Sequence, residues 1–167
     1  MVSISISVIL PKTKWANRKW LDEIARTQRQ TSVPRLKKLF QKTVFGWSNK
    51  PTFGWVQRRN ADEMSITMYP SGQYADIWNL VNAGSPAHTI MPRKRGFLRF
   101  QPGYRSATTP GTLQSRRAYR SGAFIGARQV NHPGFEARDF TKLIAEEFSD
   151  PYMGDMQTAF NNVAKTG

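Results

Sequence analysis

The fold of this chain is decided by a stretch that begins Ile77-Trp-Asn-Leu-Val-Asn-Ala-Gly-Ser-Pro-Ala-His-Thr-Ile-Met-Pro92 and closes Val130-Asn-His-Pro-Gly-Phe-Glu-Ala-Arg-Asp-Phe140. Between these two ends, residues 101–128 are rich in Gly, Ser and Arg and contain no acidic residue. A structureless connection longer than about 15 residues is unusual in a compact domain and tends to be functional or disordered. We therefore predict a basic loop insert at 101–128.

Two turns flank this insert. Gly84-Ser-Pro86 predicts a forced turn, and Pro133-Gly134 combines a fixed φ with a residue that tolerates positive φ. A β-branched residue at either glycine is expected to cost about 1 kcal/mol or more. The predicted structural turn residues are Gly84, Pro86, His132, Pro133 and Gly134.

Short elements are predicted close to these turns. The apolar spacing of Tyr74 to Asn82 indicates a short helix. Thr89 to Met91 and Phe97 to Phe100 have the pattern of strands, and we expect Pro92 to Gly96 to join them as a basic hairpin tip. The chain regains strand character at Ala127 to Val130.

The N-terminal part is expected to contain one strand and two helices. In residues 1–10, aliphatic and serine residues alternate, which is typical of a half-buried strand or arm. Thr13 is the predicted N-cap of a helix that runs to about Gln30. After a break at Thr31-Ser32, a second helix is predicted from Pro34 to Gly46.

A hairpin and a C-terminal helical segment complete the prediction. Thr52 to Arg59 and Met64 to Tyr69 alternate as two strands around a polar loop. Asp139 is the predicted N-cap of a helix to Phe148, and Asp150-Pro151 is expected to interrupt it before Tyr152 to Val163. The chain is therefore expected to form one domain, 1–167, with a C-terminal helical segment at 139–163.

Charge is the most prominent feature of the composition. The formal net charge is +14, and residues 77–135 carry nine basic and no acidic side chains, whereas residues 136–167 carry three basic and six acidic ones. A basic body with an acidic tail suits nucleic acid, an acidic partner or head-to-tail self-assembly. The sequence contains no cysteine, which excludes disulfides, thiolate zinc sites and cysteine nucleophiles. No apolar run approaches the roughly 20 residues that cross a bilayer, so no membrane partner is expected.

Motifs for catalysis are not evident. His88 and His132 are the two histidines, and neither has metal-ligand spacing, so each is interpreted as a turn or loop imidazole with one hydrogen bond. The sequence lacks a G-x-S-x-G elbow, a P-loop and a dinucleotide fingerprint. We therefore expect no enzyme activity, metal or cofactor. A small basic ribonuclease-type toxin is an alternative without a recognisable catalytic set.

Clusters of cations mark the candidate contact residues. Phosphate contact by such groups gives sequence-independent affinity, and Tyr104, Tyr119 and Phe124 could stack on bases. A solvated or partner-facing loop is the alternative interpretation. The candidate contacts to a DNA channel or partner ring are Arg93, Lys94, Arg95, Arg105, Arg116, Arg117 and Arg120. The candidate subunit interface is Glu146, Glu147 and Asp150.

The order of motifs resembles that of one protein family, the tail-completion or neck (head–tail joining) proteins of tailed bacteriophages. The matching segments are Tyr74-Ala75, Val81-Asn-Ala-Gly84, His88-Thr-Ile-Met-Pro92, Leu98-Arg-Phe100 and Val130-Asn-His-Pro-Gly-Phe-Glu-Ala-Arg-Asp-Phe140. The resemblance covers about residues 35–150. Asn82-Ala83 stand where the family usually has an acidic residue, and the 101–128 insert is longer than expected.

The resemblance implies an α+β fold with a small, mostly antiparallel sheet and helices packed on it. The residue patterns add two N-terminal helices, a C-terminal helix and the long basic loop insert to this expectation. It also implies a non-enzymatic virion protein that forms a ring around the DNA channel at the head–tail junction or the top of the tail, after synthesis in the host cytoplasm. The implied partners are other copies of this chain, with six-fold symmetry favoured over twelve-fold, and a neighbouring connector, tail terminator or tube. Phage DNA would be contacted non-specifically. The alternative is a basic nucleic-acid-binding protein that contacts phosphates through residues 93–128.

Overall fold

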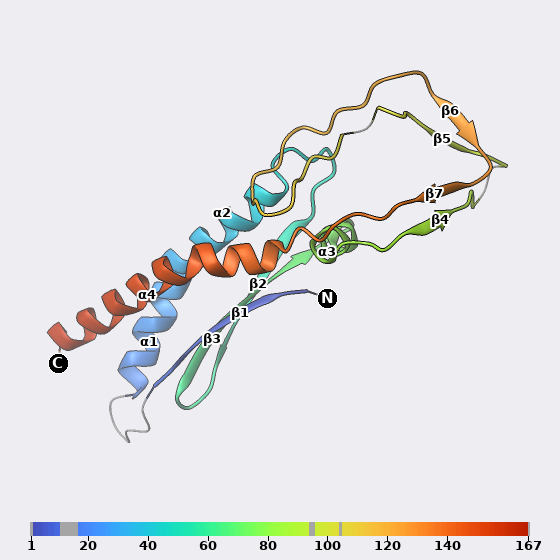
Figure 1. Ribbon diagram of the computed structural model, residues 1–167. Helices are drawn as coiled ribbons and strands as arrows, with labels where there is room; N and C mark the ends of the chain where they lie inside the picture. The colour runs from blue at the N-terminus through green and yellow to red at the C-terminus, as the bar shows by residue number, and fades with distance from the viewer. Residues whose placement is uncertain (1, 11–16, 94–95, 104, 167) are drawn as a thin grey trace.

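The chain has an α+β fold in which a small antiparallel sheet is packed with helices and a long two-stranded ribbon extends from them (Figure 1). The computed structural model describes residues 2–10, 17–93, 96–103 and 105–166. The predicted N-cap Thr13 and the basic residues Lys94 and Arg95 lie outside these ranges, as does Tyr104.

The sheet has the strand order β1-β3-β2, with β1 at Ile4–Ile9, β2 at Thr52–Arg59 and β3 at Glu63–Ser71. Both outer strands pair antiparallel to β3. Alternate residues of β3 are buried, as the period-2 pattern predicts. The strand was predicted to end at Tyr69, but β3 continues through Pro70, which pairs with Phe53 of β2. Pro70 lies beyond the last residue of β3 that pairs with β1, where a missing N–H costs no ladder bond.

A nearly unbroken helical rod packs against the sheet. It consists of α1 (Asn17–Thr27), the π-helix η1 (Gln28–Ser32) and α2 (Val33–Thr43). The predicted break at Thr31-Ser32 is therefore wrong. The wider π turn accommodates Pro34, whose ring would clash with a carbonyl one α-helical turn earlier. Because Gln28 and Ser32 are buried and hydrogen-bonded to the C-terminal helix, tertiary contacts hold the rod together at this point.

The helix α3 (Ala75–Ala83) supplies the centre of the core through Trp78. This indole is fully buried against the rings of Phe40, Phe53 and Phe140, with centroids 5.5 to 6.1 Å away. Its Nε1–H donates to the hydroxyl of Thr43 at 2.9 Å, so its polar atom is satisfied. One side chain therefore joins α2, β2, α3 and the C-terminal helix.

The helix α4 (Phe140–Thr166) is continuous, so the predicted interruption at Asp150-Pro151 is wrong. Pro151 is exposed, and water can therefore reach the carbonyl that its missing N–H leaves unbonded. On the opposite side Tyr152 and Met156 are buried, which favours continuation of the helix.

The N-terminus of α4 is capped differently from the prediction. Asp139 has a φ of 49°, and its carbonyl accepts the hydrogen bond from Leu143 N–H. The side-chain acceptor at this end is Asn82 Oδ1, which lies 3.0 Å from Thr141 N. In return, Asp139 N–H donates to the Asn82 carbonyl at the end of α3. Asn82, which stands where the resembled family has an acidic residue, thus links α3 to α4.

Four short strands form the ribbon, by which we mean residues 85–135. The strand β4 (His88–Ile90) pairs with β7 (Val130–His132), and β5 (Leu98–Phe100) pairs with β6 (Ile125–Ala127), all antiparallel. The predicted hairpin between β4 and β5 is wrong. Each of these two strands pairs instead with a strand of the returning chain, β4 with β7 and β5 with β6. Long-range pairing of this kind is not encoded in local turn signals.

The predicted loop insert is more ordered than its composition indicated. Its two limbs remain hydrogen-bonded beyond β5 and β6, from Gly103 N to Ser121 O at 3.1 Å and from Arg116 N to Ala107 O at 2.7 Å. Arg105 and Tyr119 form an isolated antiparallel bridge between these two points. The ribbon leaves the body beside α3 and doubles back, so that its closed end reaches α2 (Figure 1).

Candidate functional site

The base of the ribbon is built by the two turn glycines. Gly84 has a φ of 77° and Gly134 a φ of 83°, a region that favours glycine. A Cβ on Gly84 would lie 2.7 Å from Ala137 N, and one on Gly134 would clash with the carbonyl of Ser85. Ser85 and Phe135 exchange backbone hydrogen bonds of 3.0 and 2.9 Å. These turns therefore hold the two chains together where the ribbon leaves the body.

The two histidines lie opposite each other in the β4–β7 pair, and their rings stack with centroids 5.1 Å apart. His132 Nδ1 accepts a hydrogen bond from Gly134 N–H at 3.0 Å. His88 Nδ1 lies 2.9 Å from the carbonyl of Pro86, to which it must donate. Each imidazole thus hydrogen-bonds to a turn, but the prediction of a turn or loop position is wrong, because His88 begins β4 and His132 ends β7. Their pairing was not predicted. Pro133 lies exposed within the second turn.

The closed end of the ribbon is attached to the body by contacts that sequence reasoning missed. Ser115 Oγ donates to the carbonyl of Lys42 at 3.1 Å and accepts from Gly46 N–H at 2.9 Å. A side chain at Gly46 would clash with the Arg116 backbone. Leu113 is buried beside these residues. Position 46, which was predicted only as a helix stop, is therefore also where the ribbon end approaches the backbone closely.

A second contact attaches the other limb of the ribbon end. The Nε–H of Arg138, a residue that is 9% exposed, donates to the hydroxyl of Thr108 at 3.2 Å. Arg138 directly precedes the start of α4, and its backbone N–H donates to the Val81 carbonyl. The ribbon end is therefore attached both to α2 and to the α3–α4 junction.

The predicted basic contacts are spread along the ribbon rather than gathered at one point. Arg105 and Arg120 lie on opposite limbs near the bridge with Tyr119, and Arg116 and Arg117 lie close to the attached end. Arg93 lies near the far turn, between β4 and β5. All five side chains are exposed. The ribbon therefore displays positive charge along its length.

Large apolar side chains are exposed on the same ribbon. Met91, Phe97, Phe124 and Ile125 are between 45% and 67% exposed. The guanidinium of Arg99 lies 5.2 Å from the centre of the Phe124 ring, a cation–π contact. Exposed apolar side chains gathered on one element of a soluble domain usually mark an interaction surface. Of these, only Phe124 was singled out from the sequence.

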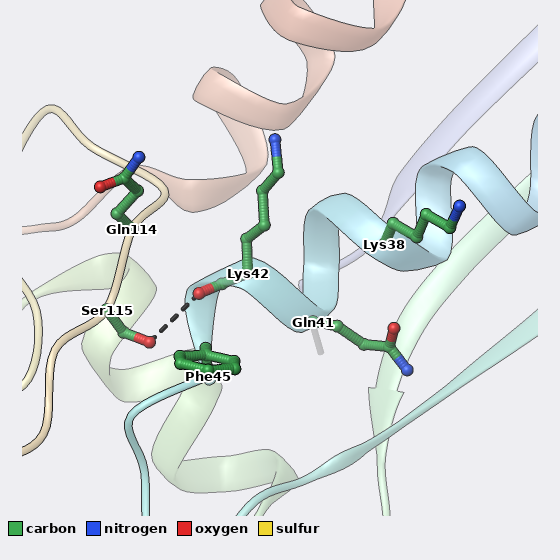
Figure 2. A pocket seen from close by; sticks show the side chains of 6 residues that line it. All are labelled: Lys38, Gln41, Lys42, Phe45, Gln114 and Ser115. Atoms are coloured by element: carbon green, nitrogen blue, oxygen red, sulfur yellow. Dashed lines mark hydrogen bonds between the residues drawn. The ribbon is translucent and has the colours of Figure 1, made fainter.

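An open groove of about 460 Å³ lies where the ribbon end meets α2 (Figure 2). Its lining residues are Lys38, Gln41, Lys42, Phe45, Gln114 and Ser115. Phe45, just after α2, is 77% exposed, and Lys50 Nζ lies 5.5 Å from its ring centre. The groove combines positive charge with an exposed aromatic ring.

The three predicted acidic interface residues of α4 have different environments. Glu147 forms an ion pair with Lys42 of the same chain at 2.7 Å. Glu146 and Asp150 are exposed on the outer side of the helix, as is Met153, which is 66% exposed. Two of the three carboxylates therefore face outward beside an exposed apolar side chain.

The layer between α4 and the rod contains buried polar contacts. Gln28 Nε2 donates to Tyr152 Oη at 2.8 Å, and burial raises the pKa of Tyr152 above its ordinary value. Asp155 accepts from Ser32 at 2.8 Å and pairs with Arg35 at 2.7 Å. These bonds hold α4 on the rod at one register.

An exposed-side contact joins α1 to the end of α4. Hydrogen bonds from Arg26 and Asn162 lower the pKa of Glu23, and its carboxylate raises the pKa of Arg26. This ion pair lies near the surface and contributes little to stability.

The described residues contain neither a metal-binding group of side chains nor a membrane-spanning helix. Across residues 2–10, 17–93, 96–103 and 105–166, no three or more acidic or histidine side chains are grouped so that they could hold a metal ion. Within the same ranges, no helix is both long and apolar enough to span a membrane.

Comparison with known proteins gave no match, whether with protein-family models, with curated proteins or with solved structures. The residues and their geometry, together with the motif resemblance, are therefore the basis for assigning a function.

Proposed function

We propose that this protein is a structural subunit of a phage neck or tail top, which assembles with copies of itself into a ring that completes the tail or joins it to the head. The observation that carries the proposal is the ribbon, which exposes Met91, Phe97, Phe124 and Ile125 on a basic background. Exposed apolar side chains at this density favour a protein partner over free solvent. The motif resemblance supports the same assignment.

Charge supports self-assembly as well. The segment 77–135 carries no acidic side chain, whereas 136–167 has an excess of them. A ring subunit needs two different and complementary lateral surfaces, because heterologous contacts close only when one surface fits another. The ribbon and the outer side of α4 have opposite charge. Further contacts would be made with the neighbouring connector, tail terminator or tube at the head–tail junction of the virion.

Measurement of the mass in solution, together with electron microscopy of the purified chain, tests this proposal. Closed rings of uniform size, and restored joining when the protein is added to heads and tails that lack it, are the expected results. A chain that remains monomeric and also fails to associate with purified heads or tails would contradict the proposal.

One observation favours nucleic-acid binding as a second candidate. Arg105, Arg116, Arg117 and Arg120 lie on a two-stranded ribbon, an element that the major groove of DNA can admit. If these arginines contact phosphates, the logarithm of the binding constant must fall linearly with the logarithm of salt concentration. A flat dependence for duplex DNA removes this candidate.

A further inference from the structure

We propose that the groove beside α2 is the site where a second copy of this chain binds, through the outer side of its α4. The inference rests on the proposed ring assembly and identifies one of its contact surfaces. The groove side consists of Lys38, Lys42 and Phe45, and we call it the basic stripe. The α4 side consists of Glu146, Asp150 and Met153, and we call it the acidic stripe.

The two stripes have the same spacing and opposite charge. In each, a charged residue is followed by a second one four positions later and by a large apolar residue three positions after that. In α4 all three residues lie on one face of the helix, whereas in α2 Lys38 and Lys42 share a face and Phe45 lies in the turn that follows. Side-by-side parallel alignment of the two faces would place Lys38 beside Glu146, Lys42 beside Asp150 and Phe45 beside Met153. The antiparallel alignment does not bring the two apolar residues together.

The charged groups remain available for such a contact. Lys38, Glu146 and Asp150 are exposed, and among residues 2–10, 17–93, 96–103 and 105–166 the ion pairs do not include them. Lys42 already pairs with Glu147 of its own chain, but its side chain is 49% exposed and its ammonium group has three N–H donors. It can therefore bridge its own Glu147 and a carboxylate of the second copy.

The apolar ends of the stripes add a short-range contact. Phe45 and Met153 are 77% and 66% exposed, so both present apolar surface to water. A thioether packed against an aromatic ring makes a favourable contact, as Met153 of one copy would with Phe45 of the next. Within its own chain, the Phe45 ring is already in contact with Lys50. Contact with a second copy would remove both apolar side chains from water.

The arrangement also allows the contact to repeat. The basic stripe lies on α2 and the turn after it, and the acidic stripe lies on α4, so each copy carries one of each. A contact between unlike surfaces is heterologous and repeats from copy to copy, and it generates a ring when the rotation between copies closes and an open filament when it does not. The acidic stripe on α4 of one copy would thereby bind the basic stripe of the next copy.

Reversal of one charge pair tests the proposal in the full-length chain. Sedimentation measurements should show self-association weakened about tenfold or more by Lys38→Glu and by Glu146→Lys, since each change places like charges together. The double variant should regain most of the lost association. Neither change removes a partner of the Lys42–Glu147 pair. Lys37→Glu and Glu136→Lys are the matched controls, because both are exposed and lie outside the stripes.

The outcomes separate this interface from the ring proposal itself. If the wild-type chain assembles but Lys38→Glu and Glu146→Lys behave like the controls, or if the double variant is not rescued, the interface is wrong and the ring proposal stands. A wild-type chain that stays monomeric and does not join heads to tails overturns both. Loss of single-stranded oligonucleotide binding in Lys38→Glu, with unchanged self-association, would assign the groove to DNA and overturn the interface.

Discussion

The body and the ribbon of this molecule are stabilised in different ways. The body buries a continuous apolar core that includes Trp78, Phe40 and Ile66, all of them at most 1% exposed. The ribbon has paired backbones, exposed side chains and a few anchoring contacts, such as those of Ser115 and Gly134. Since apolar burial dominates folding free energy, the body carries the stability and the ribbon is left free to present a surface. The predictions below test this division.

Trp78→Ala should produce the largest loss of stability. Removal of a fully buried indole leaves a cavity between four elements and removes the hydrogen bond that the Thr43 hydroxyl accepts from it, so we expect a loss of about 3–5 kcal/mol. Chemical denaturation measures it. Phe124→Ala in the ribbon is the comparison and should change the free energy of unfolding by less than about 0.5 kcal/mol. Equal losses at the two positions would contradict the division.

Tyr152→Phe tests the polar layer inside the body. Because the change leaves the buried Gln28 amide without its acceptor, we expect a loss of about 1–3 kcal/mol near neutral pH. A Gln157→Ala control on the exposed side of α4 should cost far less.

Because of Tyr152, the free energy of unfolding should depend on pH in the alkaline range. Its pKa is raised in the folded state, so its contribution to stability is complete below about pH 10, the ordinary tyrosine value, and is lost as pH rises through the folded pKa. The wild-type free energy of unfolding should therefore fall more steeply above about pH 10 than that of Tyr152→Phe. If the free energy of unfolding falls with pH equally in the two proteins, the pKa of Tyr152 is not raised in the folded state.

Gly134→Ala should weaken the base of the ribbon. The φ of 83° and the clash with the Ser85 carbonyl predict a cost of about 1–3 kcal/mol, localised to the β4–β7 pair. Hydrogen exchange should show faster exchange of ribbon amides with little change in β3. Gly96→Ala is the control, since a Cβ there meets no atom within 4 Å. Uniform loss of protection across the body would argue that ribbon and body unfold as one unit.

Among the substitutions that remove a structural contact, Ser115→Ala should have the smallest effect. Loss of its bonds to Lys42 O and Gly46 N predicts about 0.5–1.5 kcal/mol at the ribbon end. Thr112→Ala, in the same turn, is a suitable comparison, because its hydroxyl accepts one exposed bond from Gln114 N. Exchange rates around residues 106–117 should distinguish the two variants.

Local patterns predicted the elements of the body well. The serine–aliphatic alternation of Ile4–Ile9 and the β2–β3 hairpin were correct, because each strand has one buried and one exposed face. The spacing of apolar residues also predicted α3. The breaks at Thr31-Ser32 and Asp150-Pro151 were wrong because buried contacts of Gln28 and Tyr152 override the local proline and turn signals.

The ribbon and the groove were less predictable. Pairing of β4 with β7 joins residues more than 40 positions apart, and periodicity within one strand carries no information on its partner. The groove depends on Ser115 meeting the end of α2, a contact between segments that are distant in sequence. Neither Lys38 nor Phe45 was singled out from the sequence, and only the fold shows that the ribbon end borders them.

Electron microscopy and mass measurement of the full-length chain test whether this protein assembles into a ring. We expect closed rings of one size that also join purified heads to tails. A protein that remains monomeric at high concentration, and stays unbound when heads and tails are present, would contradict it.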